Sequence, residues 1–198
     1  MRFKLFGVKI YVSFLFCAVL CLMLCIDKTG YALPVIITAA LHEGAHIFAM
    51  WVCNKKPGEI HFIPGGVLIS GEPSCVFEPS LFVILSGPVF NIAVSLAAFL
   101  RFNLSGSENA LVFAFLNLFT GVFNLLPFSG LDGGSALYVI LSKRFLPDRA
   151  QKTVRSITLV SSLAVFATGV FLALQNKINI SVFTAAVYLF ICAVGCRM

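Results

Sequence analysis

Residues 33–52 read LPVIITAALHEGAHIFAMWV, an apolar run that contains the pattern H-E-x-x-H at positions 42–46. In a helix, His42 and His46 lie on one face and can both reach one zinc ion, while Glu43 can take a proton from a metal-bound water. Ionisable side chains are costly inside a membrane, so such a cluster in an apolar run is a candidate functional site. The pattern predicts a zinc-dependent hydrolase.

The whole sequence has the composition of an integral membrane protein. Hydrophobic residues make up 60% of its 198 residues and charged residues only 11%, and the mean hydropathy is +1.01. Six apolar runs match the length that a bilayer core requires: 10–26, 33–52, 80–100, 110–126, 156–174 and 178–196. No small-residue cleavage site follows the first run, so we interpret it as a retained helix and not as a signal peptide. The prediction is an all-α polytopic membrane protein with six transmembrane helices in one domain, residues 1–198.

The basic residues are distributed unevenly between the two sides that six spans define. Eleven fall on the side of the termini and three on the other. By the positive-inside rule, both termini and the loops 53–79 and 142–155 are expected in the cytoplasm. Binding to anionic lipid headgroups accounts for the basic residues, and no nucleic-acid partner is predicted. The eleven are Arg2, Lys4, Lys9, Lys55, Lys56, Lys143, Arg144, Arg149, Lys152, Arg155 and Arg197; the three are Lys28, Arg101 and Lys177.

Two regions depart from plain membrane spans. Residues 58–71 read GEIHFIPGGVLISG, two β-prone runs around a Pro-Gly-Gly turn, which predicts a small β-hairpin between the second and third helices. Residues 124–134 read NLLPFSGLDGG, in which Pro127 and the glycines should break the fourth helix. A broken helix in a bilayer usually lines a cavity, and this one would deliver Asp132 to it.

A catalytic zinc ion needs a third protein ligand and an open position for water. Asp132 is the only acidic residue, apart from Glu43, that is placed in apolar surroundings beside a helix break. The other acidic residues fall in loops or at the ends of spans. His61 is the one remaining histidine, and it lies in the predicted hairpin.

Four motifs together resemble the site-2 protease family of intramembrane zinc metalloproteases: HEGAH at 42–46, SGPVFN at 86–91, NLLP at 124–127 and LDGG at 131–134. The segment IPGGV at 63–67 resembles the branch that contains stage IV sporulation protein FB. The resemblance implies that His42, His46 and Asp132 bind Zn2+ and that Glu43 activates water.

The same resemblance places Asn91, Asn124 and Pro127 close to the active site, where the amides help to position substrate or metal-binding backbone. Hydrogen bonding between helices without a catalytic part is an equally good interpretation of the two asparagines. The sequence differs from the family in having Phe128, Ser129 and Gly130 where a second proline is common. We expect neither the cytoplasmic CBS module of the sporulation branch nor the PDZ insertion of the stress-response branch, because residues 1–198 contain no segment that resembles them.

The sequence therefore predicts a multi-pass protease of the cell membrane that cleaves a membrane-associated protein at a zinc site opening to the cytoplasm. The strand that includes Gly66 and Val67 could hold an unwound substrate by β-addition. Candidate substrates are a membrane-tethered precursor of a sporulation sigma factor, an anti-sigma factor or a signal-peptide remnant, and membrane inhibitors or regulators are further candidate partners. One alternative is a metal transporter, which would need ligands along the outer half of the spans; the other is an inactive scaffold, which the complete ligand set disfavours.

Overall fold

The computed structural model describes residues 2–5, 8–54, 57–63, 66–71 and 80–174. The chain divides into two compact units, Met1–Val122 and Phe123–Met198, and each is treated by itself. The expectation of a single domain stays a prediction.

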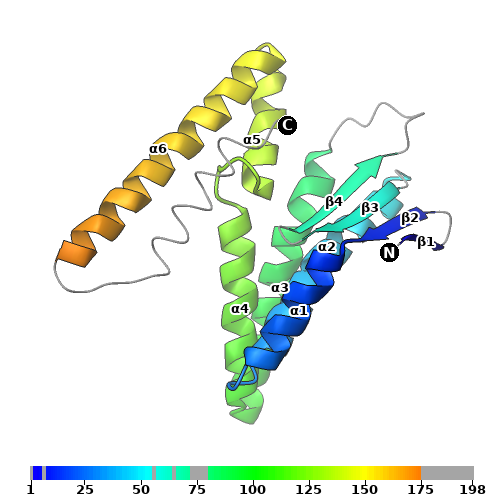
Figure 1. The fold of residues 1–198 in the computed structure, drawn as a ribbon, viewed down its shortest axis with the longest axis vertical. Helices are drawn as coiled ribbons and strands as arrows, with labels where there is room; N and C mark the ends of the chain where they lie inside the picture. The colour runs from blue at the N-terminus through cyan, green and yellow to red at the C-terminus, as the bar shows by residue number, and fades with distance from the viewer. Residues whose placement is uncertain (1, 6–7, 55–56, 64–65, 72–79, 175–198) are drawn as a thin grey trace. The chain divides into compact units, whose positions relative to one another are not determined.

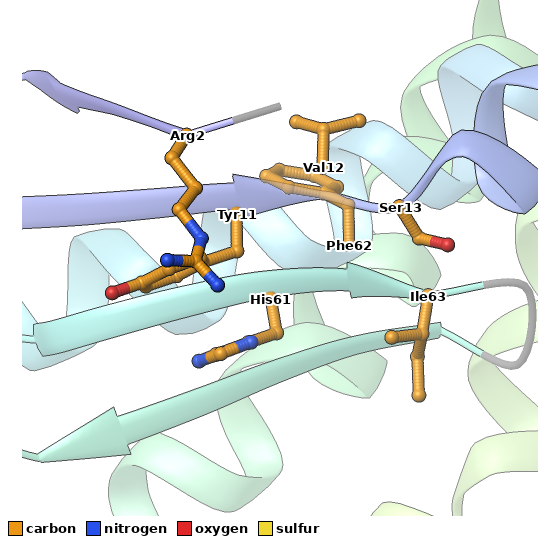
Figure 2. Close-up of a pocket in the computed structure, with 7 residues that line it drawn as sticks. All are labelled: Arg2, Tyr11, Val12, Ser13, His61, Phe62 and Ile63. Carbon is orange, nitrogen blue, oxygen red and sulfur yellow. The ribbon is translucent and has the colours of Figure 1, made fainter.

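The first unit contains a four-stranded sheet in the order β1-β2-β3-β4 (Figure 1). The strands are β1 (Arg2–Leu5), β2 (Val8–Val12), β3 (Pro57–Ile63) and β4 (Gly66–Gly71). β1 and β2 are antiparallel, as are β3 and β4, whereas β2 and β3 run parallel and lie side by side in Figure 2. The hairpin predicted between the second and third helices is thus present as β3 and β4, and it is part of a larger sheet.

The helices of the first unit are α1 (Phe14–Ile26), α2 (Ala32–Val52), α3 (Leu81–Ser105) and α4 (Glu108–Asn124), of which α4 ends just inside the second unit. α2 and α3 pack on each other through Ala49, Met50 and Val83. Ser95 on α3 donates a hydrogen bond to the Ala114 carbonyl on α4 at 2.7 Å, which fixes these two helices together.

The second unit contains α5 (Asp132–Ser142) packed against α6 (Pro147–Leu174). α4 ends at Asn124 and a new helix begins at Asp132, so the predicted break around Pro127 is present. Gly133 and Gly134, however, lie inside the first turn of α5 and do not interrupt it.

Three described helices are long and apolar enough to cross a membrane: Ala32–Val52, Leu81–Ser105 and Pro147–Phe171. α1 is apolar but shorter, because β2 takes the residues with which the first predicted span was to begin. α6 begins at Pro147 and not at residue 156, so much of the predicted loop 142–155 is helical. Run 178–196 lies outside the described residues. The molecule is a membrane protein, while its six-span topology stays a prediction.

Candidate metal centre

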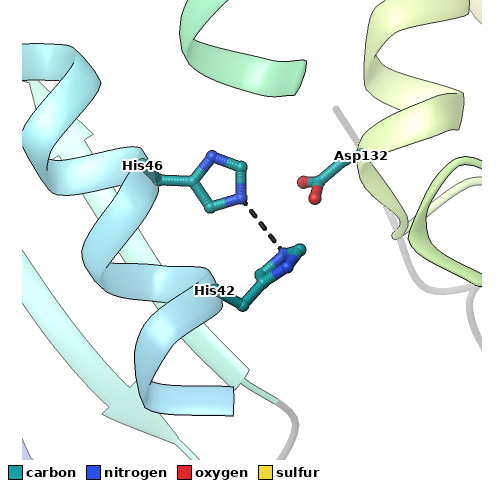
Figure 3. Close-up of side chains that lie close together, drawn as sticks. All are labelled: His42, His46 and Asp132. Atoms are coloured by element: carbon teal, nitrogen blue, oxygen red, sulfur yellow. Dashed lines mark hydrogen bonds between the residues drawn. The ribbon is translucent and has the colours of Figure 1, made fainter. Parts of the chain in front are cut away.

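The two histidines of the HEGAH motif meet on the inner face of α2. His42 and His46 are both buried, and their Nε2 atoms are 3.2 Å apart (Figure 3). Their ring planes cross at 81°, so the two Nε2 atoms converge while the rings do not stack. Helical periodicity thus places the two imidazoles on one face of α2 and directs their Nε2 atoms to one point, as the motif predicts.

The imidazole of His46 is held by α3. Its Nδ1 lies 2.8 Å from the carbonyl oxygen of Val83, which can only accept a hydrogen bond. Nδ1 must therefore carry the proton, and the lone pair of the neutral ring stays on Nε2. A metal-binding histidine usually has its second nitrogen fixed in this way.

The spacing of the two nitrogens fits a zinc ion. Zn–N bonds of about 2.0–2.1 Å in tetrahedral geometry place two ligand nitrogens roughly 3.4 Å apart. The observed separation of 3.2 Å is close to this value. The pair can therefore bind one ion with little movement of either ring.

Gly87 of α3 lies against both histidine rings. A Cβ at this position would overlap Nε2 of His46 and would come within 2.8 Å of Cε1 of His42. Only glycine leaves room for the rings where they are. Gly87 lies in the SGPVFN motif, but its contact with the histidines was not predicted, although a Gly-Pro pair inside an apolar helix is a signal of close helix approach.

Two further polar side chains, Ser86 of α3 and Glu43 of α2, lie next to the histidine pair in the sequence motifs or in space. The Ser86 hydroxyl lies 2.7 Å from the Val83 carbonyl oxygen and 3.2 Å from the Ala45 carbonyl oxygen, so its single proton can serve either. Glu43 lies between the two histidines on α2 and is half-buried.

One helical turn before His42, a buried pair of polar side chains joins α2 and α4. Thr38 of α2 accepts a hydrogen bond from Asn117 of α4 at 3.1 Å, and both side chains are buried. Asn91 of α3 is fully buried, and within the described residues neither atom of its amide has a hydrogen-bond partner. Asn91 had been singled out from the sequence, but Thr38 and Asn117 had not, because their pairing depends on contacts between helices.

Asp132 belongs to the second unit, where it opens α5 and is half-buried (Figure 3). The chain reaches it through a tight turn in which the N–H of Leu131 donates to the Phe128 carbonyl at 3.0 Å. Gly130 has a φ of +89° at the third position of this turn, a conformation that glycine adopts without strain. A Cβ on Gly133 or Gly134 would overlap carbonyl oxygens of the same connection, so these glycines let α5 begin close to the turn.

The turn before Asp132 is anchored by α6. The backbone N–H of Ser129 donates a hydrogen bond of 2.7 Å to the hydroxyl of Thr158, which is fully buried. Thr158 in turn donates to the Val154 carbonyl at 2.9 Å. No sequence motif indicated Thr158. Asn124 and Pro127, predicted as supporting residues, lie at the end of α4 and in the connection that follows.

The remaining histidine and the remaining predicted substrate contacts are in the sheet. His61 on β3 stacks on Tyr11 and lies 3.3 Å from Glu59, whose pKa is lowered by hydrogen bonds from Lys9 and then His61. Gly66 and Val67 are in β4, paired in register with Ile63 and Phe62. His61 is therefore engaged in the sheet and apart from the histidine pair of α2.

Comparison with known proteins agrees with this picture. Residues 105–165, which include Asp132, match Peptidase family M50. A zinc metalloprotease of Methanocaldococcus jannaschii is 27% identical over 157 residues, which are 72% of this chain and 45% of that protein. The chain thus spans about half the length of this curated relative.

A solved structure shares the fold. The site-2 protease of Methanocaldococcus jannaschii superposes with a TM-score of 0.70 at 22% identity, over 98% of this chain and 93% of that one. The specific likeness to the sporulation branch stays a prediction.

Proposed function

Since the resemblance to site-2 proteases predicted from the sequence is confirmed, we propose that this chain is an intramembrane zinc metalloprotease. The observation that carries the proposal is the buried His42–His46 pair, with Nε2 atoms 3.2 Å apart on a helix long and apolar enough to span a bilayer. A zinc metalloprotease needs this arrangement, in which two imidazole nitrogens are directed to one point.

His42, His46 and Asp132 are the proposed zinc ligands. Two imidazole nitrogens and one carboxylate oxygen are donors that zinc prefers, and three protein ligands are typical of a catalytic site that keeps one position for water. When bound there, the ion would lower the pKa of its water and polarise the carbonyl of the peptide bond.

The protein's own groups then have separate tasks. Glu43 takes a proton from the attacking water and passes it to the leaving amine. Val83 keeps the proton of His46 on Nδ1, so the lone pair of Nε2 would be available to the ion. Gly87 has no side chain, and this lets α3 lie close to both histidine rings.

The proposed substrate is a membrane-associated protein, because the histidine pair lies within an apolar helix. The distribution of basic residues supports a site that opens to the cytoplasm and cytoplasmic termini. Cleavage of a membrane-tethered sigma-factor precursor in sporulation is the specific candidate that follows from the likeness of residues 63–67 to the sporulation branch.

Replacing Glu43 with glutamine tests the mechanism. The carboxamide cannot accept the proton, so cleavage should fall by at least about 100-fold while zinc content stays unchanged. The assay would follow proteolysis of a panel of single-span membrane proteins reconstituted with the full chain, with zinc measured by atomic emission.

Glu108→Gln is the matched control, because Glu108 is exposed at the start of α4. This variant should keep both zinc and cleavage. Undiminished cleavage by Glu43→Gln, or wild-type protein that cleaves while free of metal, would contradict the proposal.

A further inference from the structure

A cavity of about 170 Å3 opens on the face of the sheet where β2 leads into α1 (Figure 2). Arg2, Tyr11, Ser13, His61 and Ile63 line it. Pockets that enclose a drug-sized ligand have volumes of roughly 300–1,000 Å3, and this cavity is smaller. It can therefore hold a small polar group of a larger ligand, while the rest of that ligand lies outside the cavity.

The Arg2 guanidinium lines this cavity and is held over the ring of Tyr11. The guanidinium carbon of Arg2 is 5.4 Å from the centre of the Tyr11 ring, and the His61 ring stacks on the same tyrosine with centroids 4.4 Å apart. The sheet register places Tyr11 between Arg2 and His61. Among the described residues, Glu59 pairs with Lys9 and His61 and not with Arg2. The N–H donors of Arg2 are therefore available to an anion.

The surrounding face of the sheet is basic. Side chains alternate along a strand, so Arg2 and Lys4 share a face of β1, and Lys9 lies on the Tyr11 side of β2. Glu59 is the carboxylate on this face within the described strands, and it is paired with Lys9 at 3.1 Å. Three cations against one carboxylate favour an anionic ligand.

The cavity also lies at a boundary between charged and apolar surface. Ser13 is the N-cap of α1, and its side chain makes no capping hydrogen bond. Immediately after it, the side chains of Phe14 and Leu15 are 86% and 59% exposed, and α1 contains no charged residue. A surface of this kind is suited to contact with lipid, so we place the level of the lipid headgroups at Ser13, where the surface changes.

We propose that this cavity binds the headgroup phosphate of an anionic glycerophospholipid. The Arg2 guanidinium donates to the phosphate oxygens, and the acyl chains lie along the exposed apolar side chains of α1. An acidic peptide would satisfy Arg2 equally well, but it would leave Phe14 and Leu15 uncovered.

Lipid retention by the purified full chain tests this proposal. The chain would be extracted from vesicles of equal parts phosphatidylglycerol and phosphatidylcholine, and the lipids still bound would be counted by native mass spectrometry. Wild-type protein should retain phosphatidylglycerol in preference. Arg2→Gln should weaken this retention about tenfold or more, as expected for the loss of charge-assisted hydrogen bonds.

Two comparisons separate the site from general electrostatics. Arg101→Gln removes the same charge from an exposed position on α3 and should retain phosphatidylglycerol as the wild type does. Tyr11→Phe keeps the ring under Arg2 and should also retain it, whereas Tyr11→Leu should lose it. Unchanged zinc content in every variant would show that the fold is intact.

Three results would overturn the proposal. The first is equal retention of phosphatidylglycerol by Arg2→Gln and Arg101→Gln. The second is displacement of the lipid by inorganic phosphate at millimolar concentration, which would identify free phosphate as the ligand. The third is displacement by an acidic peptide, in an Arg2-dependent way, at concentrations where an uncharged peptide of equal length has no effect.

Discussion

Gly87 illustrates how a residue without a functional group can decide whether a site forms. Its missing side chain leaves the space that the His46 and His42 rings occupy. Because α2 and α3 pack tightly through Ala49, Met50 and Val83, the helices cannot separate locally without loss of that contact. An added methyl group would therefore push the rings before it moved the helices.

Gly87→Ala should lower zinc affinity by about 10–100-fold, the range found when groups supporting metal ligands are changed. Competition with a fluorescent zinc chelator would measure the effect. Gly44→Ala is the matched control, since a Cβ at Gly44 meets no atom within 4 Å. Equal zinc affinity of the two variants would show that Gly87 has no part in positioning the histidines.

Thr158 supports the connection before Asp132 in the second unit, because its hydroxyl accepts a hydrogen bond from the backbone N–H of Ser129. Valine has nearly the same shape but no acceptor, so Thr158→Val should leave that buried N–H unpaired and cost about 1–3 kcal/mol of stability. Thermal unfolding in detergent would measure the loss. Thr153→Val should have little effect, because Thr153 is exposed and bonds only to the Arg149 carbonyl of its own helix.

Among the elements, β4 stands at one edge of the sheet and pairs only with β3 in the described part of the chain. No other described strand pairs with its outward N–H and C=O groups, which is the basis for the predicted β-addition of substrate. Successive residues of a strand direct these groups to alternate sides. Of Val67 and Leu68, one therefore points its N–H outward.

Val67→Pro and Leu68→Pro together test whether β4 holds the substrate. Both should abolish cleavage, and the variant that loses the outward N–H should keep normal zinc content and a normal β3–β4 pairing. Cleavage of the reconstituted panel and zinc content are the two measurements. If both variants cleave as the wild type does, substrate is not held by this strand.

The connection between α1 and α2 is built on one carboxylate. Asp27 accepts hydrogen bonds from the Thr29 hydroxyl at 2.6 Å and from the backbone N–H groups of Ala32, Thr29 and Gly30. The Thr29 hydroxyl and then these N–H groups lower the pKa of Asp27 from 3.8 to about 2.

A lowered pKa means that this connection is stabilised above the unfolded-state pKa and loses that stabilisation as pH falls from about 4 to about 2. The protection factor of the Ala32 amide, which is the intrinsic exchange rate divided by the observed rate, should fall as pH falls through this interval. In Asp27→Asn the protection factor should lack this pH step. An identical profile in both proteins would exclude Asp27 as its source.

At the scale of the molecule, the sequence predicted what local patterns determine. The apolar run 33–52 became α2 with a difference of one residue, and the hairpin strands formed where two β-prone runs flank a turn. The motif also predicted His42, His46 and Glu43 as site residues without reference to any other element, and the structure places the two histidines together.

The remainder depends on contacts between distant segments. β2 was assigned to the first membrane span because its residues are apolar, yet it pairs in parallel with β3, so that Lys9 aligns with Glu59. No local pattern reports such a pairing. Val83, Gly87 and Thr158 act through neighbouring helices, so their roles become visible only when the helices are packed.

The open edge of β4 also bears on how a protease of this kind would choose its targets. Backbone hydrogen bonds along a strand edge are the same for every amino-acid sequence, so this edge alone cannot distinguish one peptide from another. Selection would then fall on how readily a candidate's membrane helix unravels. Segments with glycine, proline or asparagine near the bond to be cut would be processed across quite different sequences, and uninterrupted leucine-rich helices would be spared.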